Sequence, residues 1–159
     1  MKLRKKIPLF LALVLGLGLV LPVFGGKPDL EATEGIRWVS YEKGLAQSQK
    51  QGKKIFLHFY SDWCAYCKKM ADETFQNYQV VSYLNKNFIA IKSDSEKNQN
   101  LAMRYFVRGL PTTWFLTETG KKISFRPGYI PPEELLIFLK YIHGNAYDKM
   151  SLDDFKSSM

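Results

Sequence analysis

The sequence predicts an α/β domain in which a central mixed sheet is covered by helices on both faces. Three observations predict this fold. Residues 55–60 and 88–91 are short apolar runs of the kind found in buried central strands. Residues 112–117 and 122–126 flank a turn that contains Gly120, which indicates a hairpin. Amphipathic helical patterns separate the earlier strands, and such connections favour parallel pairing.

The segment before the first apolar run adds two expected elements. Residues 36–39 are expected to form a short strand. A helix then starts at Ser40, whose hydroxyl suits the N-cap position, and ends at Gly52, a residue type that favours a helix C-terminus. The expected buried side of this helix consists of Tyr41, Leu45 and Ala46.

Four further helices are expected along the rest of the domain. One opens at Cys64, and a short one contains Val80 and Leu84. The next, which ends at the break formed by residues 109–111, is predicted from one apolar helical stripe: Leu101, Ala102, Tyr105 and Phe106. Pro132 and two following acids start the last helix. Its expected buried side consists of Leu135, Leu136, Leu139 and Ile142.

The amino-terminal residues have the pattern of an export signal. Residues 2–6 contain four basic side chains, and an almost unbroken apolar run follows at 7–21. We therefore expect a signal peptide at residues 1–25 and a linker at 26–35. The alternative is an uncleaved membrane anchor, because the apolar run approaches the ~17 residues that can span a bilayer.

The remaining chain has room for one ordinary domain, which we place at residues 36–143, followed by a tail at 144–159 with a short helix. Without the four basic residues of the leader, 19 basic side chains stand against 15 acidic ones. These charges are intermixed, so they indicate a solvated surface and no nucleic-acid partner.

The two cysteines of the chain stand as Cys-x-x-Cys within residues 63–68, which read WCAYCK. They follow a predicted strand and open a predicted helix, where free N–H groups and the helix dipole favour a thiolate at Cys64. A thiolate attacks disulfides, and Cys67 lies one turn further on, where it can close onto Cys64. The spacing therefore predicts a redox-active disulfide, with no other cofactor.

Other uses of the two cysteines are weighed against this one. A static bridge in a binding module is an alternative because exported domains use disulfides structurally, although so short a loop constrains the unfolded chain little. Two thiolates make half a zinc site, and His58 and His143 supply no closing ligand pair, so no metal is expected. Covalent haem attachment is excluded because Lys68, not histidine, follows Cys67.

The residues around the cysteines resemble a known family. FYSDWCAYCKKM at residues 59–70, with ETF at 73–75, resembles the C-terminal thioredoxin-like domain of the transmembrane reductase DsbD and small exported proteins related to it. RGLPT at 108–112 matches the cis-proline loop of that family, and GY at 128–129 matches the step before its last helix. The resemblance covers residues 36 to 143 and implies a thioredoxin-like fold.

The resemblance implies a thiol–disulfide oxidoreductase. Cys64 would then attack the substrate and Cys67 would resolve the mixed disulfide. Pro111 is expected to be cis, in a loop that lies against the disulfide where the backbone of a partner docks, and Leu110 is expected to bind substrate beside it.

The side chains next to the cysteines are given supporting roles. Trp63 and Tyr66 are expected to shape an apolar rim, with Tyr66 in contact with substrate. Lys68 and Lys69 would add positive potential, although a solvated helix face explains these two lysines equally well.

Two departures from the family limit these implications. His58 stands where thioredoxins carry a buried Asp that assists proton transfer. An imidazole can accept that proton, but a packed histidine bonded to backbone is the simpler interpretation. Ala65 and Tyr66 replace the Gly-Pro between the cysteines. Reduction potentials on this fold run from about −270 to about −120 mV, a span of about 7 kcal/mol that is enough to reverse the direction of exchange. We expect a reductase and keep an oxidase or isomerase as the alternative.

The expected partners follow from this chemistry. They are oxidised protein substrates and a thiol electron donor that is either membrane-bound or soluble. The expected location is the periplasm or, with an uncleaved leader, the outer face of the cytoplasmic membrane. We expect a monomer that contacts the membrane only through a retained leader.

Overall fold

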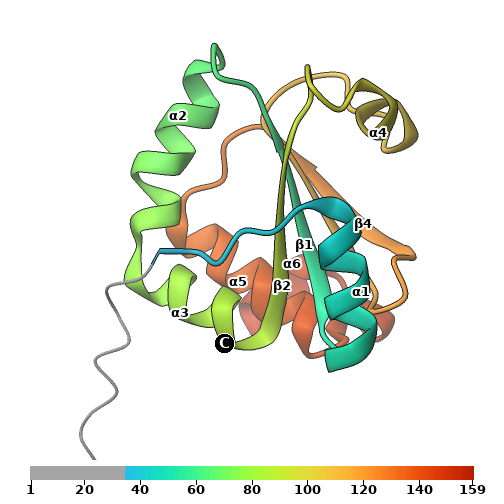
Figure 1. Cartoon of the computed structure of the whole chain (residues 1–159). Coiled ribbons are helices and arrows are strands. Elements are labelled where there is room, and N and C mark those ends of the chain that lie inside the picture. Colours follow the sequence, from blue (N-terminus) through green and yellow to red (C-terminus); the bar gives the residue numbers. More distant parts are fainter. Residues whose placement is uncertain (1–34) are drawn as a thin grey trace, which may run out of the picture.

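A computed structural model describes residues 35–159 (Figure 1). The expected signal peptide at 1–25, and the expected linker except for Gly35, lie outside the described residues. No helix within residues 35–159 is long and apolar enough to cross a membrane.

Four strands form one mixed sheet in the order β2-β1-β3-β4. Their bounds are β1 Lys54–Tyr60, β2 Phe88–Asp94, β3 Thr112–Leu116 and β4 Lys122–Pro127. Strands β1 and β2 are parallel, whereas β3 runs antiparallel to both β1 and β4. The predicted parallel pair and hairpin are therefore confirmed, and together they make the sheet mixed.

Helices cover both faces of the sheet, as predicted; Figure 1 shows α2 and α3 on one side of the strands and α1 and α4 on the other. The helix bounds are α1 Tyr41–Gln51, α2 Ala65–Asp72, α3 Tyr78–Asn87, α4 Gln99–Arg104, α5 Pro132–His143 and α6 Leu152–Ser157. Single 3₁₀ turns lie at Thr74–Gln76 and Ala146–Asp148. The tail helix α6 begins after Ser151, which caps it by accepting a hydrogen bond from the Asp154 N–H.

Alternation along the strands builds two hydrophobic cores. Phe56 and Phe115 face the core shared with α2, α3 and α5, whereas Ile55, Leu57 and Leu116 face the core shared with α1 and α4. Strand β1 is buried along both faces except at its ends, which confirms its predicted central position. The redox motif therefore follows a strand that is held from both sides.

The expected strand at residues 36–39 is wrong. Only Val39 pairs with the sheet, through one parallel bridge to Ile91. The Trp38 N–H donates instead to the Ile36 carbonyl, at 2.9 Å, which bends the backbone. The Trp38 ring packs edge-on against Phe75 with 5.1 Å between ring centres. This segment therefore joins the domain through an aromatic side chain and not through a ladder of backbone hydrogen bonds to the sheet.

The expected buried side of α1 is wrong at Ala46, which is exposed. The residues buried on this helix are Gly44 and Ser48, with Tyr41 and Leu45 partly buried beside them. A Cβ atom at position 44 would lie 2.4 Å from the Ile91 side chain. The helix therefore approaches β2 along a small-residue face, which a search for large apolar residues does not find.

The expected helical stripe of α4 is wrong at Phe106. The helix ends at Arg104, and Tyr105 is buried, but Phe106 has a left-handed backbone with φ of 52° and is 73% exposed. The Phe106 N–H bonds the Met103 carbonyl and the Val107 N–H bonds the Ala102 carbonyl, which closes the helix end. That turn directs the phenyl ring into solvent.

Candidate redox site

The two cysteines form a disulfide at the start of α2, with their Cα atoms 5.2 Å apart. Cys64 occupies the N-cap position, and the backbone N–H of Cys67 donates to the Cys64 sulfur over 3.1 Å. Both residues are about 95% buried, with exposed fractions of 5% and 4%. In the reduced state this N–H and the helix dipole would stabilise a thiolate on Cys64, which is the form that attacks disulfides.

Two exposed aromatic side chains flank the disulfide. Trp63 is 68% exposed and Tyr66 is 64% exposed. The indole N–H of Trp63 donates to the carboxylate of Glu96 over 2.6 Å. Sequence reasoning missed Glu96, because 33 positions separate the two residues and no local pattern connects them.

Residues 61–64, which connect β1 to α2 and which we call the redox turn, are held by further contacts with the turn after β2. The Ser95 N–H donates to the Tyr60 carbonyl at 2.9 Å. The Lys97 ammonium lies 3.1 Å from the Asp94 carboxylate and 3.9 Å from that of Asp62. Burial opposes ionisation of Asp94, but the hydrogen bonds from Lys97 and from two backbone N–H groups outweigh it, so the pKa of Asp94 is lowered.

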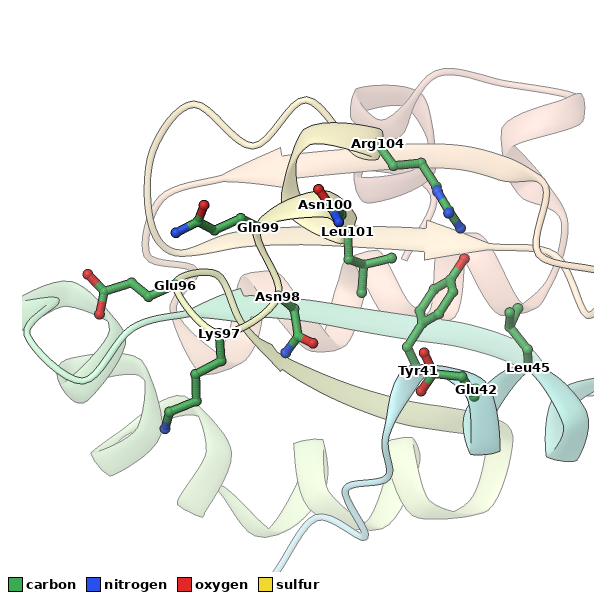
Figure 2. A pocket seen from close by; sticks show the side chains of 10 residues that line it. All are labelled: Tyr41, Glu42, Leu45, Glu96, Lys97, Asn98, Gln99, Asn100, Leu101 and Arg104. Atoms are coloured by element: carbon green, nitrogen blue, oxygen red, sulfur yellow. The ribbon is translucent and has the colours of Figure 1, made fainter.

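The same turn borders a cleft of about 720 Å³ between α1 and α4, shown in Figure 2. Glu96 and Lys97 lie at one end of the cleft, and Arg104 and Tyr41 come from the two helices. The lining of the cleft is mostly polar.

Pro111 lies at the same end of the sheet as the disulfide. Thr112, the next residue, pairs with Phe59 near the end of β1, and Cys64 follows that strand. The Leu110–Pro111 peptide bond is cis, Pro111 is buried and Leu110 is partly buried. The Pro111 carbonyl accepts a hydrogen bond of 2.7 Å from the Gly128 N–H.

His58 is buried on the face of the sheet that carries Phe56, with an exposed fraction of 1%. The expected hydrogen bond to backbone is wrong, because the Nδ1 atom lies 3.0 Å from the side-chain hydroxyl of Thr113, the residue opposite it on β3. The Phe75 ring packs edge-on at 4.9 Å. Burial, with a smaller contribution from Lys92, lowers the pKa of His58 to about 3, so this imidazole is neutral at physiological pH.

The two lysines after Cys67 lie on the exposed side of α2. The Lys69 ammonium lies 4.6 Å from the centre of the Tyr129 ring, and the Tyr129 hydroxyl donates to Glu73 over 2.5 Å. Within residues 35–159, no group of three or more histidine, cysteine or acidic side chains is placed to hold a metal ion.

Comparison with known proteins identifies the class of this site. A family model described as a thioredoxin-like domain matches residues 41–143, so the chain belongs to the thioredoxin-like family. The Cys-x-x-Cys disulfide at the start of α2 and the oxidoreductases among its relatives make it a thioredoxin-like thiol–disulfide oxidoreductase.

Two relatives show where the similarity lies. A disulfide bond reductase DsbH from Chlamydia pneumoniae is 30% identical over 112 residues, which are 61% of this chain and 68% of the relative. The thiol:disulfide interchange protein DsbD of Vibrio cholerae is 36% identical over 86 residues, which are 52% of this chain but only 14% of that protein.

Solved structures agree with the fold. A thioredoxin from Thermus thermophilus is 28% identical with a TM-score of 0.63, over 69% of this chain and 88% of that one. A DsbH oxidoreductase is 25% identical with a TM-score of 0.62, over 71% of this chain and 88% of that one.

Proposed function

We propose that this protein is an exported disulfide reductase that transfers two electrons from its cysteine pair to oxidised protein substrates. The observation that carries the proposal is the position of Cys64 at the N-cap of α2, with the Cys67 N–H bonded to its sulfur. The similarity to a disulfide bond reductase supports the reducing direction.

The reaction begins from the reduced pair. The Cys64 thiolate attacks one sulfur of the substrate disulfide, and the other substrate sulfur leaves as a thiolate that takes a proton from water. Cys67 then loses its proton and attacks the Cys64 sulfur, which releases the second substrate thiol and forms the Cys64–Cys67 disulfide. A dithiol electron donor reduces that disulfide and becomes oxidised in turn.

The surrounding residues support this exchange in different ways. Trp63 and Tyr66 flank the disulfide and contact the substrate together with Leu110, and Pro111 presents its loop to the substrate backbone. Lys68 adds positive potential on the exposed side of α2. His58 lies within hydrogen-bond distance of the Thr113 hydroxyl and packs against Phe75, so it is a positioning residue for the strand beneath the site.

Export is supported by the composition of the leader, with its basic residues at 2–6 and apolar run at 7–21. The redox pair would then act in the periplasm or at the outer face of the cytoplasmic membrane. A fusion of residues 1–35 to a reporter enzyme that is active only outside the cytoplasm tests this, and an inactive, stably expressed fusion would exclude export.

The reduction potential of the pair tests the direction. Equilibration with glutathione, read from the fraction of alkylated thiols, should give a value near that of thioredoxin, about −270 mV. A value near that of DsbA, about −120 mV, would overturn the reductase and favour an oxidase.

Replacement of the resolving cysteine tests the mechanism. In Cys67→Ala, the mixed disulfide between Cys64 and an oxidised model substrate should accumulate because no second thiol releases it. The Cys64→Ala variant is the matched control and should form none. Equal and slow alkylation of both reduced cysteines at neutral pH would contradict an activated Cys64.

A further inference from the structure

An exposed aromatic surface lies where α4 ends beside β4, remote from the sulfur atoms in sequence and in sheet position. We name it the β4 patch, and it consists of Phe106, Trp114, Lys122 and Phe125. Phe106 is 73% exposed and Phe125 is 50% exposed. Exposed aromatic surface of this kind marks interaction sites on soluble domains.

The patch is ordered by contacts among its own members. The Trp114 and Phe125 rings are stacked with their centres 4.7 Å apart. The Lys122 ammonium lies 4.9 Å from the Phe106 ring centre and 5.1 Å from that of Trp114. It also donates to the Arg104 carbonyl over 2.9 Å, which links β4 to the end of α4. A partner would therefore meet side chains that have little further conformational entropy to lose.

The backbone at Phe106 has an unfavourable conformation. Its left-handed φ of 52° costs an L-residue roughly 1–2 kcal/mol, and it is rare for a bulky side chain. Glycine adopts this conformation without penalty. This chain instead has a large phenyl ring at this position, exposed to solvent, and local strain of this kind gathers at functional sites.

The charge around the patch defines the partner. From residue 99 to 125 the chain carries four basic residues, Arg104, Arg108, Lys121 and Lys122, and one acidic residue, Glu118. Arg126 lies on the opposite face of β4, over the Phe138 ring and 4.0 Å from the Glu134 carboxylate, so it adds no charge to the patch. A second copy of the chain would bring the same positive charge, which disfavours self-association through this surface. An acidic partner is favoured by the same charges.

The edge of the sheet defines the shape of the partner. Among the described residues β4 pairs only with β3, so its other edge offers backbone N–H and C=O groups to an added strand. We propose that the β4 patch docks an extended acidic segment of a protein partner, which adds to β4 as a fifth strand and places apolar side chains on Phe106 and Phe125. Docking itself does not require redox exchange. The inference rests on the proposed function only because the docked partner is taken to exchange disulfides with Cys64.

A designed peptide tests the docking site on the oxidised full chain. The probe is a fluorescein-labelled peptide of sequence Glu-Phe-Glu-Val-Glu-Phe-Glu, with a charge-reversed version in which lysine replaces each glutamate. Fluorescence anisotropy should show binding of the acidic peptide only. Affinity should fall at least about tenfold in Phe106→Ser and in Lys122→Glu, because each removes a central contact.

Matched variants on α3 serve as controls. Tyr78→Ser removes an exposed aromatic side chain of similar exposure, 61%, and Lys86→Glu reverses an exposed charge, and both should leave binding unchanged. Circular dichroism verifies that every variant is folded, and Lys122→Gln replaces Lys122→Glu if the latter is not. Hydrogen exchange should show new protection in β4 on peptide binding, and none in β2.

Several results would overturn the inference. Equal binding of the two peptides, or equal binding by the patch variants, excludes the site. Concentration-dependent dimerisation that Phe106→Ser abolishes would assign the surface to a second copy, and binding to anionic phospholipid vesicles but not to the peptide would assign it to a membrane. Docking that fails while the Cys67→Ala variant still traps substrate would remove this inference alone and leave the reductase proposal intact.

Discussion

The two faces of the sheet are closed to different degrees, and the length of the covering helix accounts for the difference. On one face the twelve-residue helix α5 reaches across the hairpin, where Phe138 packs on Phe115 with ring centres 4.8 Å apart. On the other face α4 has six residues and ends before it covers β4. Trp114 and Phe125 are therefore left to stack on each other at the surface.

This difference separates the roles of aromatic side chains that look alike in sequence. Phe115 and Phe125 both lie in the predicted hairpin, but Phe115 is fully buried and Phe125 is 50% exposed. The covered face stabilises the domain, whereas the open face offers a surface to partners. Four measurements would break or sharpen that distinction.

The largest expected effect comes from truncating the two phenylalanines of the hairpin. Phe115→Ala leaves a cavity in a packed core and should cost about 3–5 kcal/mol of unfolding free energy. Phe125→Ala removes one stacked, half-exposed ring and should cost about 1 kcal/mol. Urea unfolding of both variants measures the difference, and similar costs would show that both faces are equally closed.

The second effect concerns the buried imidazole on the covered face. The pKa of His58 is lowered to about 3 in the folded chain, whereas the unfolded chain binds the same proton near its ordinary value of 6.5. Acidification therefore favours the unfolded state, and the unfolding free energy should fall by about 1.4 kcal/mol per pH unit from pH 6 towards 4.

The variant His58→Gln isolates this contribution. It removes the titrating group, so its unfolding free energy should change far less over the same pH range. Asp94, whose pKa is also lowered, adds its own loss of stability only below its ordinary value of 3.8. An unchanged slope between pH 6 and 5 in His58→Gln would refute the assignment to His58.

The third effect concerns the strained residue on the open face. Phe106→Gly relieves the left-handed conformation and should raise the unfolding free energy by up to about 1 kcal/mol, less the extra entropy of the unfolded glycine. The same variant should no longer bind the acidic peptide in the anisotropy measurement. A stabilised variant that still binds would show that the ring at 106 plays no part in docking.

The smallest effect concerns the bond between the redox turn and the turn after β2. Glu96→Ala removes the acceptor of the Trp63 indole N–H and should lower kcat/KM for a protein disulfide about two- to fivefold. Glu96→Gln keeps an acceptor oxygen and should restore most of the activity. The indole N–H resonance of Trp63 should shift in the alanine variant alone, and an identical shift in both variants would argue against this contact.

Much of the fold was predictable because it depends on local pattern. The apolar runs of β1 and β2, the turn between β3 and β4, and the proline at the start of α5 each carry their signal within a few residues. The Cys-x-x-Cys spacing likewise predicts a pair that closes, since three positions in a helix are one turn.

The predictions that are wrong concern residues whose position depends on contacts between segments far apart in the sequence. The apolar stripe that ends in Phe106 has helical spacing, but the chain leaves the helix at Arg104 and the stripe ends with it. Ala46 is more apolar than Gly44, yet only Gly44 fits against Ile91. The partner of His58 depends on the register between β1 and β3, which places Thr113 opposite it.

The sequence by itself determined the reaction class and the pair of cysteines that forms the disulfide, because a strand, a helix start and the spacing of two cysteines are local properties. Only the tertiary structure decided what surrounds them. It brought Glu96 to Trp63, buried His58 beside Thr113, and left one face of the hairpin uncovered. Those arrangements depend on packing between segments tens of residues apart, where side-chain volume and helix length decide which groups meet.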